Sequence, residues 1–268
     1  MKGSGEYFSN EFLNQKPLPY SFKMITQSHH AESFRLVPAT STPVSPEKVA
    51  SLLASEWESF TKNTKGSLAE SARSMKSLPL GVTSSFQHWD PYPISIVSAQ
   101  GAWMTDVDGR QLLDLSMGFG AMLAGHLNPV VVEEVKASLD TGMLFVTPSP
   151  ISTDAAERIC RRFGIDQIRF TNSGTESTMY AVRVARSATG KRDIVKVEGG
   201  YHGHHDVVMV SQKPDLRFAG PADNPLSVPS SAGVTEAVVR DTIVIPFNDA
   251  DALERALSRN DVACFIVE

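Results

Sequence analysis

Short apolar runs alternate with helical segments over the C-terminal part of the chain, and this alternation constrains the fold more than any other feature. The runs have the length and the β-branched content of strands, and they occupy residues 168–171, 194–197, 207–210, 242–245 and 262–267. Helical spacing of apolar residues fills 175–188 and the segment that Asn248 or Asp249 would cap. Neighbouring parallel strands need a crossover connection, which is usually a helix. We therefore predict an α/β fold with a mostly parallel sheet flanked by helices.

The rest of the chain divides into regions of different character. Residues 1–45 are rich in Ser, Pro, Thr and Asn without a sustained period, which predicts a disordered or loosely docked arm. Residues 46–142 are predicted to hold helices, the first beginning at Ser45-Pro46, and an antiparallel hairpin with its turn at Asp108-Gly109. Residues 143–268 then form the α/β domain. Its apolar last strand has no helix after it to cover its second face, so we expect the domain to be incomplete at the C-terminus.

Composition excludes several classes of protein. Hydrophobic residues make up 41% of the 268 residues, which is enough for a sizeable core. The net charge is -5 and no basic block occurs, which argues against nucleic acid and anionic membranes as partners. No apolar run approaches the ~20 residues that cross a bilayer. Two cysteines cannot make a disulfide framework, and a reducing, cytoplasmic location is expected.

The first segment that could carry chemistry is Thr171-Asn172-Ser173-Gly174-Thr175-Glu176, where a predicted strand passes through a small polar loop into a helix. The N–H groups of a first helical turn are unpaired, and the helix dipole is positive there. Gly174 would let a ligand approach the backbone, and Ser173 and Thr175 add hydroxyl donors. These features are typical of a phosphate-binding turn. Plain helix capping by Ser173 or Thr175 explains the same residues equally well.

The second segment is Glu198-Gly199-Gly200-Tyr201-His202-Gly203-His204-His205-Asp206, which follows the next strand. In one hypothesis the glycines make room for a flat ligand and the ring of Tyr201 stacks on it. In the other, His202, His204 and Asp206 bind zinc in a metal-dependent hydrolase. Further ligand histidines should then follow downstream, but no histidine lies beyond His205. We therefore expect no metal site completed within this chain.

Several motifs occur together in one order. They are the segment from Thr171 to Met179, Arg183-Val184-Ala185-Arg186, the segment from Glu198 to His204, Asp106-Val107-Asp108-Gly109, Gly125-His126-Leu127-Asn128-Pro129 and Ile266-Val267-Glu268. As a set they resemble the class-III aminotransferases, and among these the glutamate-1-semialdehyde aminomutases. The resemblance covers about residues 67–268.

This resemblance implies a fold-type-I transferase that binds pyridoxal 5′-phosphate and works as a homodimer. Ser173, Gly174 and Thr175 would then hold the cofactor phosphate. Tyr201 would stack on the pyridine ring, His202 would support that wall, and Glu268 would open a Glu-Pro element beside the cofactor. Ser84 and Phe119 match positions at the substrate.

The implied reaction moves an amino group between an amine or amino acid and an oxo acid or aldehyde, both small molecules. An aminomutase-like isomerase is the related possibility. The family's Schiff-base lysine, and the carboxylate that faces the pyridine nitrogen, lie beyond the position of Glu268. We therefore assign no catalytic residue within the chain and expect that it cannot transaminate alone. A non-catalytic truncated relative that keeps only fold and dimerisation is a third hypothesis.

One departure from the family's pattern concerns the substrate. Three positions after the serine matched by Ser84, the aminomutases carry an arginine that grips the substrate carboxylate, and this chain has Gln87. A neutral amide cannot make the bidentate, charge-assisted contact of a guanidinium group. The difference argues against glutamate-1-semialdehyde itself as the substrate.

Overall fold

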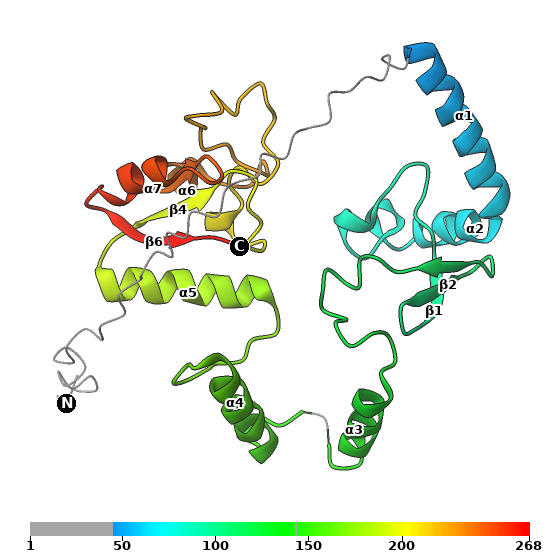
Figure 1. The fold of residues 1–268 in the computed structure, drawn as a ribbon, viewed down its shortest axis with the longest axis horizontal. Coiled ribbons are helices and arrows are strands. Elements are labelled where there is room, and N and C mark those ends of the chain that lie inside the picture. Colours follow the sequence, from blue (N-terminus) through cyan, green and yellow to red (C-terminus); the bar gives the residue numbers. More distant parts are fainter. Residues whose placement is uncertain (1–44, 143) are drawn as a thin grey trace, which may run out of the picture. The chain divides into compact units, whose positions relative to one another are not determined.

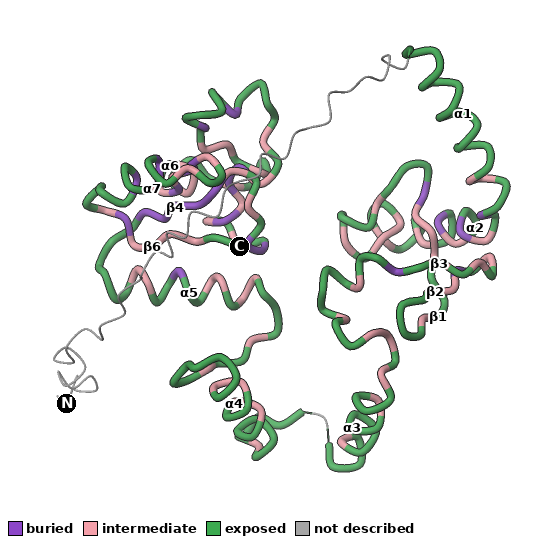
Figure 2. Tube along the Cα trace, viewed as in Figure 1, coloured by how far each residue is buried: buried purple, intermediate pink, exposed green. Residues whose placement is uncertain are grey.

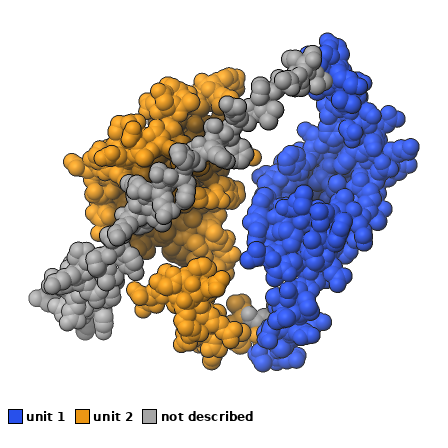
Figure 3. Space-filling view, viewed as in Figure 1, with its two compact units in different colours: residues 1–141 blue, residues 142–268 orange. Residues whose placement is uncertain are grey.

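A computed structural model describes residues 45–142 and 144–268. The chain forms two compact units, residues 1–141 and 142–268, which Figure 3 shows in different colours. The predicted N-terminal arm lies outside the described residues, apart from Ser45.

The described part of unit 1 combines helices with a small sheet (Figure 1). Its α-helices are α1 (Pro46–Asn63), α2 (Lys65–Ser74) and α3 (Pro129–Leu139), and short 3-10 turns stand at Pro79–Gly81 (η2) and Ser85–Gln87 (η3). The predicted start of α1 is confirmed, because the Ser45 hydroxyl accepts from the N–H of Lys48 at 3.3 Å and Pro46 takes the first helical position.

The sheet of unit 1 is antiparallel, with the order β1-β2-β3. The predicted hairpin is formed by β2 (Trp103–Asp106) and β3 (Gln111–Leu113), and Gly109 has the φ of +81° that its turn requires. The strand β1 (Ile96–Gln100) was not predicted. It pairs with β2 across the tight turn at Gly101, where φ is +57°.

Unit 2 has a parallel sheet covered by helices on both faces, as the alternation predicts. Its order along the chain is α4 (Pro150–Phe163), α5 (Gly174–Thr189), β4 (Asp193–Val197), the 3-10 turn η4 (Asp206–Val208), α6 (Glu236–Arg240), β5 (Thr242–Ile245), α7 (Ala250–Leu257) and β6 (Val262–Ile266). The strand order is β5-β4-β6, so β4 is central. Figure 1 shows α5 on one face of this sheet and α6 and α7 on the other.

The strand β4 is buried along its length (Figure 2), and its alternate residues supply two cores. Val195 and Val197 pack with Ile245 and with Ala252 and Ala256 of α7. Ile194 packs on the opposite face with Val182 of α5 and Val208 of η4. Lys196 shares the face of Ile194, because side chains two apart in a strand point the same way.

Two of the predicted strands are wrong. Residues 168–171 form no strand in the described part of the chain. Residues 207–210 instead begin in the turn η4, where the N–H of Val208 donates to the carbonyl of His205 at 3.1 Å. Val210 makes a single bridge, to Pro229, flanked by hydrogen bonds from the N–H of Ser211 to the carbonyl of Val228 and from the N–H of Ser230 to the carbonyl of Met209. An apolar run shows that a segment is buried, but it does not show that a partner strand is in reach.

Across the described ranges, no helix combines the length and the apolar character that crossing a bilayer would need.

Candidate functional site

The N-terminus of α5 is capped by its own loop. The Ser173 hydroxyl accepts from the N–H of Glu176 at 3.2 Å, and a Glu176 carboxylate oxygen accepts from the N–H of Asn172 at 2.7 Å. The capping interpretation is therefore confirmed at Ser173. The N–H groups of Gly174 and Thr175 have no acceptor in the described part of the chain, as is usual in a first helical turn.

Gly174 borders open space. A methyl group added to its Cα would meet no atom within 4 Å, and its backbone does not have a positive φ. Ser173 and Gly174 are both exposed. The turn therefore combines free N–H donors, a hydroxyl group and room for a ligand at the positive end of a 16-residue helix.

The loop that follows β4 docks against this same helix end. We refer to residues 198–209 as the Tyr201 loop. The N–H of His204 donates to the Thr175 hydroxyl at 3.1 Å, and the Thr178 hydroxyl donates to the carbonyl of His202 at 2.6 Å. The backbone of Gly203 lies so close that an added Cβ would be 2.8 Å from the Cα of Thr175. The two segments singled out in the sequence thus meet at one edge of the sheet of unit 2.

Tyr201 lies on the exposed side of this loop. Its side chain is half exposed, and its hydroxyl hydrogen-bonds with Nδ1 of His204 at 3.1 Å. The ring of His204 meets it edge-on, with centroids 5.5 Å apart. A fixed, solvent-accessible aromatic ring therefore stands beside the first turn of α5.

His202 is buried behind Tyr201 and carries an unpaired nitrogen. The residue is 7% exposed, and its Nε2 is buried without a hydrogen-bond partner in the described part of the chain. Burial lowers the pKa of His202, the charge of Lys196 lowers it further, and the carboxylate of Glu268 opposes both. The imidazole is therefore neutral near pH 7, with one polar atom still to be satisfied. Glu268 itself is exposed, after the end of β6.

Lys196 is a site residue to which the sequence analysis gave no role. It is 0% exposed, and its Nζ donates to the carbonyls of Val197 at 3.1 Å and Val210 at 2.8 Å. Burial lowers the pKa of Lys196 to about 8, although the Glu198 carboxylate opposes this shift. The signal that could have indicated burial is that Lys196 interrupts an otherwise apolar run, residues 194–197.

The lowered pKa of Lys196 predicts that unit 2 becomes more stable in mild alkali. Between about pH 8 and pH 10.5 the unfolded lysine is protonated while the folded one is not, so the unfolding free energy rises with pH. We expect a gain of about 2 kcal/mol from pH 7 to pH 9.5 relative to Lys196→Met, from urea unfolding of both chains. The exposed Lys191→Met is the control and should follow the wild type. Parallel curves for wild type and Lys196→Met would contradict the prediction.

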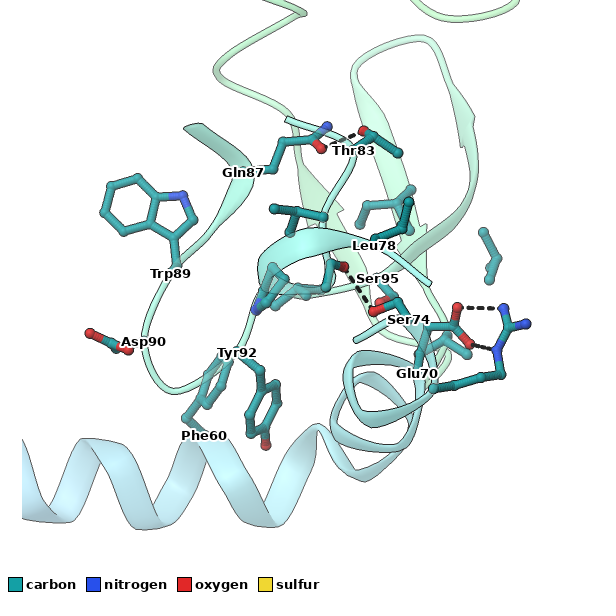
Figure 4. Close-up of a pocket in the computed structure, with 18 of the residues that line it drawn as sticks. Phe60, Glu70, Ser74, Leu78, Thr83, Gln87, Trp89, Asp90, Tyr92 and Ser95 are labelled. Atoms are coloured by element: carbon teal, nitrogen blue, oxygen red, sulfur yellow. Dashed lines mark hydrogen bonds and ion pairs between the residues drawn. The ribbon is translucent and has the colours of Figure 1, made fainter. Parts of the chain in front are cut away.

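Ser84 and Phe119, the predicted substrate residues, lie in unit 1 on neighbouring turns. Ser84 caps η3, and the side-chain oxygen of Gln87 accepts from the N–H of Ser84 at 3.3 Å and from the Thr83 hydroxyl at 2.7 Å, the latter drawn in Figure 4. Phe119 is 81% exposed, and its ring meets that of Phe86 at 5.5 Å and 72°. An aromatic pair therefore stands beside the Ser84 turn.

A hydrogen-bonded pair, Asp114 and His126, fixes the turn that carries Phe119. The Asp114 carboxylate accepts from the N–H groups of Ser116 and Met117 and contacts Nε2 of His126 at 2.7 Å. The hydrogen bond from His126 is the largest cause that lowers the pKa of Asp114. Phe119 has a φ of +56°, which is strained for a residue with a side chain. Neither Asp114 nor His126 was predicted as a functional residue.

Unit 1 also has a cavity of about 950 Å³ between α1, α2 and β1 (Figure 4). Its walls are mainly apolar and aromatic, and include Trp57, Phe60, Leu78, Trp89, Tyr92 and Ile94. Thr83 and Gln87 line one side, whereas Ser84 and Phe119 are not among its lining residues. Of its charged residues, Glu70 and Arg73 are paired with each other at 2.7 Å. The cavity therefore offers a binding surface rather than a set of catalytic groups.

The zinc hypothesis finds no geometric support. His202 is buried, while His204 is exposed and engages Tyr201. In the described residues, no group of three or more His, Cys, Asp or Glu side chains is placed to hold a metal ion.

The residues at the N-terminal end of α5 fit a flat ligand that carries a phosphate group. The open space at Gly174 and the free N–H groups suit the phosphate. The exposed ring of Tyr201 and the unpaired Nε2 of His202 lie on the loop that docks beside them. Glu268 is near enough to influence His202.

Comparisons with known proteins agree with this geometry and confirm the resemblance. The profile of the family described as Aminotransferase class-III matches residues 85–268. A glutamate-1-semialdehyde 2,1-aminomutase of Methanothrix thermoacetophila is 38% identical over 218 residues, which are 81% of this chain and 49% of the relative.

Solved structures give the same result. The glutamate-1-semialdehyde-aminomutase from Pseudomonas aeruginosa PAO1 superimposes with a TM-score of 0.73 at 28% identity, over 85% of this chain and 49% of that one. A transaminase solved with PLP bound has a TM-score of 0.68 at 35% identity, over 75% and 46%. The chain spans about half the length of the curated relatives it matches. This chain belongs to the class-III aminotransferase family.

Proposed function

We propose that the chain provides the phosphate-binding turn and the stacking wall of a pyridoxal-phosphate-dependent enzyme. This enzyme transfers an amino group between an amine or amino acid and an oxo acid or aldehyde. Class-III aminotransferases use pyridoxal 5′-phosphate, and one similar transaminase was solved with it bound. The observation that carries the proposal is the hydrogen bond from His204 to Thr175, 3.1 Å long, because it joins the Tyr201 loop to the turn at Gly174.

When bound, the cofactor supplies an electron sink for bonds broken at the substrate carbon, and the protein supplies binding, orientation and electrostatics. The N–H groups of Gly174 and Thr175 would bind the phosphate, helped by the helix dipole. The Ser173 and Thr175 hydroxyls each accept one hydrogen bond in the structure and keep their own proton to donate. Tyr201 would cover one face of the ring and exclude water from it.

His202 and Glu268 would complete the wall behind this ring. The neutral His202 has an unpaired Nε2, which could accept or donate one hydrogen bond at the ligand, depending on its tautomer. Glu268 follows β6 and acts electrostatically on His202. In this proposal both residues orient the ligand and neither bonds to it covalently.

The lysine that holds the cofactor covalently is proposed to lie outside residues 1–268. Lys196 is unsuited to that role because its Nζ is fully buried and engaged by two carbonyls. Lys191 and Lys213 are exposed, beyond the C-terminal end of α5 and after the Tyr201 loop respectively. The 268-residue chain should therefore bind the cofactor without a covalent link and without turnover.

Titration of this chain with pyridoxal 5′-phosphate, followed by ³¹P NMR and equilibrium dialysis, tests the proposal. We expect one cofactor per chain, and at least tenfold weaker binding of pyridoxal, because pyridoxal lacks the group that the α5 turn binds. Borohydride reduction should leave no cofactor attached to Lys196. Equal affinity for pyridoxal and for pyridoxal 5′-phosphate would contradict phosphate binding by the turn at residues 173–175. Absence of binding would favour a non-catalytic relative.

The presence of Gln87 favours a substrate that has no carboxylate at the Ser84 turn. Its amide is used to hold Thr83 and Ser84 and carries no charge. If a substrate end does reach this turn, Gln87→Arg should raise kcat/KM of the complete enzyme for carboxylate-bearing donors by about tenfold or more, the value of one charge-assisted hydrogen bond. The matched amides of the same donors should not respond. An unchanged ratio of acid to amide would show that this turn does not contact the substrate. Assays of the complete enzyme with these acids and amides, and with glutamate-1-semialdehyde as a further substrate, separate aminotransferase from aminomutase activity.

We further propose a cytoplasmic homodimer. The support is an uncovered apolar helix, α3, in which Val130, Val131 and Val135 are all more than half exposed. Sedimentation of the complete protein tests the dimer, and a monomer at micromolar concentration would contradict it.

A further inference from the structure

The Tyr201 loop leaves β4 and returns to it through a narrow neck. It begins immediately after Val197 and ends immediately before Val210. The N–H of Gly199 donates to the carbonyl of Ser211 at 2.8 Å across this neck. At the far end, the hydroxyls of Thr175 and Thr178 hold the backbone of His204 and His202. The position of Tyr201 therefore depends on attachments at both the neck and the tip.

Lys196 joins the two sides of the neck. Its Nζ donates to the carbonyl of Val197, just before the loop, and to the carbonyl of Val210, just after it. Val210 is 0% exposed, and Lys196 is the donor that its carbonyl has within the described residues. A buried carbonyl without a donor is strongly unfavourable, so this contact decides whether the neck can close.

A lysine is an unexpected residue at this position. Lysine is rarely fully buried without a charged partner, because its ammonium loses hydration. No ion pair of Lys196 with a carboxylate occurs in the described ranges, and an aliphatic residue would fill the same core position next to Ile194. The ammonium group is therefore best explained by the two carbonyls that it binds.

We propose that Lys196 is a positioning residue of the cofactor site, whose buried amino group holds the neck of the Tyr201 loop closed and thereby sets Tyr201 and His202 beside the first turn of α5. The effect on the cofactor rests on the proposed function above. The effect on the loop does not.

Hydrogen exchange of the cofactor-free 268-residue chain tests the loop. In Lys196→Met, the amides of residues 199–205 should exchange at least tenfold faster than in the wild type, while those of α7 stay protected. Lys191→Met removes an exposed lysine of the same unit and should leave both regions unchanged. A folded Lys196→Met chain whose loop exchanges at the wild-type rate overturns the proposal.

A measurement without any variant applies if Lys196→Met does not fold. In a chain labelled with ¹⁵N-lysine, the Nζ protons of Lys196 should exchange slowly with water at pH 7. They should also show cross-relaxation to Val210 and Ser211. Fast exchange, or absence of that contact, overturns the proposal.

Cofactor binding separates this inference from the proposed function. Lys196→Met should bind pyridoxal 5′-phosphate at least tenfold more weakly than Lys191→Met. The circular-dichroism band of each bound cofactor should also shrink, because this band reports how the ring sits against Tyr201. Unchanged affinity and band with a loosened loop would overturn the positioning role. If the wild type binds no cofactor, the proposed function fails, while the exchange data still decide whether Lys196 closes the neck.

Discussion

Replacing Gly203 by alanine should detach the Tyr201 loop from α5 and weaken binding of pyridoxal 5′-phosphate by at least a hundredfold. The new Cβ would lie 2.7 Å from the Thr175 hydroxyl oxygen and 2.8 Å from its Cα, and the second contact is with backbone that cannot move without shifting the helix. Gly203 also has a φ of +103°, which an alanine rarely adopts. Strain and overpacking together should lower the unfolding free energy of unit 2 by about 3 kcal/mol.

Gly199 provides the matched control in the same loop. It has a positive φ of +77°, but a Cβ there would meet nothing within 4 Å. Gly199→Ala should therefore show only the backbone strain, about 1–2 kcal/mol, and keep most of the cofactor affinity. Urea unfolding and dialysis of both variants measure the difference. If the two variants lose affinity equally, then close packing of the loop on Thr175 is not what forms the site.

The sheet of unit 2 was predictable because its strands are apolar runs separated by helices. The runs at 194–197, 242–245 and 262–267 are apolar apart from Lys196 and Thr242, and the helices between them leave parallel pairing as the simple solution. The run at 207–210 has the same composition, but it begins in the turn η4 and makes one bridge in the described part of the chain, from Val210 to Pro229. Whether such a run meets a partner strand depends on residues far along the chain, which local periodicity cannot show.

The site was predictable in its parts more than in its connections. From the sequence, the residue types at 173–175 fit a phosphate-binding turn and plain helix capping equally well, and the aromatic ring at 201 is one that could stack on a flat ligand. The role of Lys196 could not be inferred, because it depends on the carbonyl of Val210, which is 14 residues away and is brought near only by the folded loop. The Asp114–His126 pair in unit 1 is a second tertiary contact of this kind.

Gly174→Asp distinguishes helix capping from phosphate binding at the start of α5. If the turn only caps the helix, cofactor affinity should not change, whereas a turn that binds the phosphate should lose affinity. Aspartate in a first helical turn is favourable, so the apo chain should gain about 0.3–1 kcal/mol of unfolding free energy. The substituted position borders open space, which leaves room for the new side chain. A carboxylate there would face the cofactor phosphate, and two like charges about 4 Å apart repel by up to ~4 kcal/mol near a protein surface. Binding should fall by more than about a hundredfold.

Gly174→Asn separates the effect of charge from the effect of size. Asparagine has almost the shape of aspartate but no charge, so it should weaken pyridoxal 5′-phosphate binding less than aspartate does. Binding of unphosphorylated pyridoxal should respond equally to the two variants, because it has no dianion for the carboxylate to repel. Glu176 already places one carboxylate at this helix end, but it is held on the Asn172 side by a 2.7 Å hydrogen bond. If Gly174→Asp stabilises the apo chain and leaves cofactor affinity unchanged, the loop at 173–175 only caps a helix, and the phosphate must bind elsewhere.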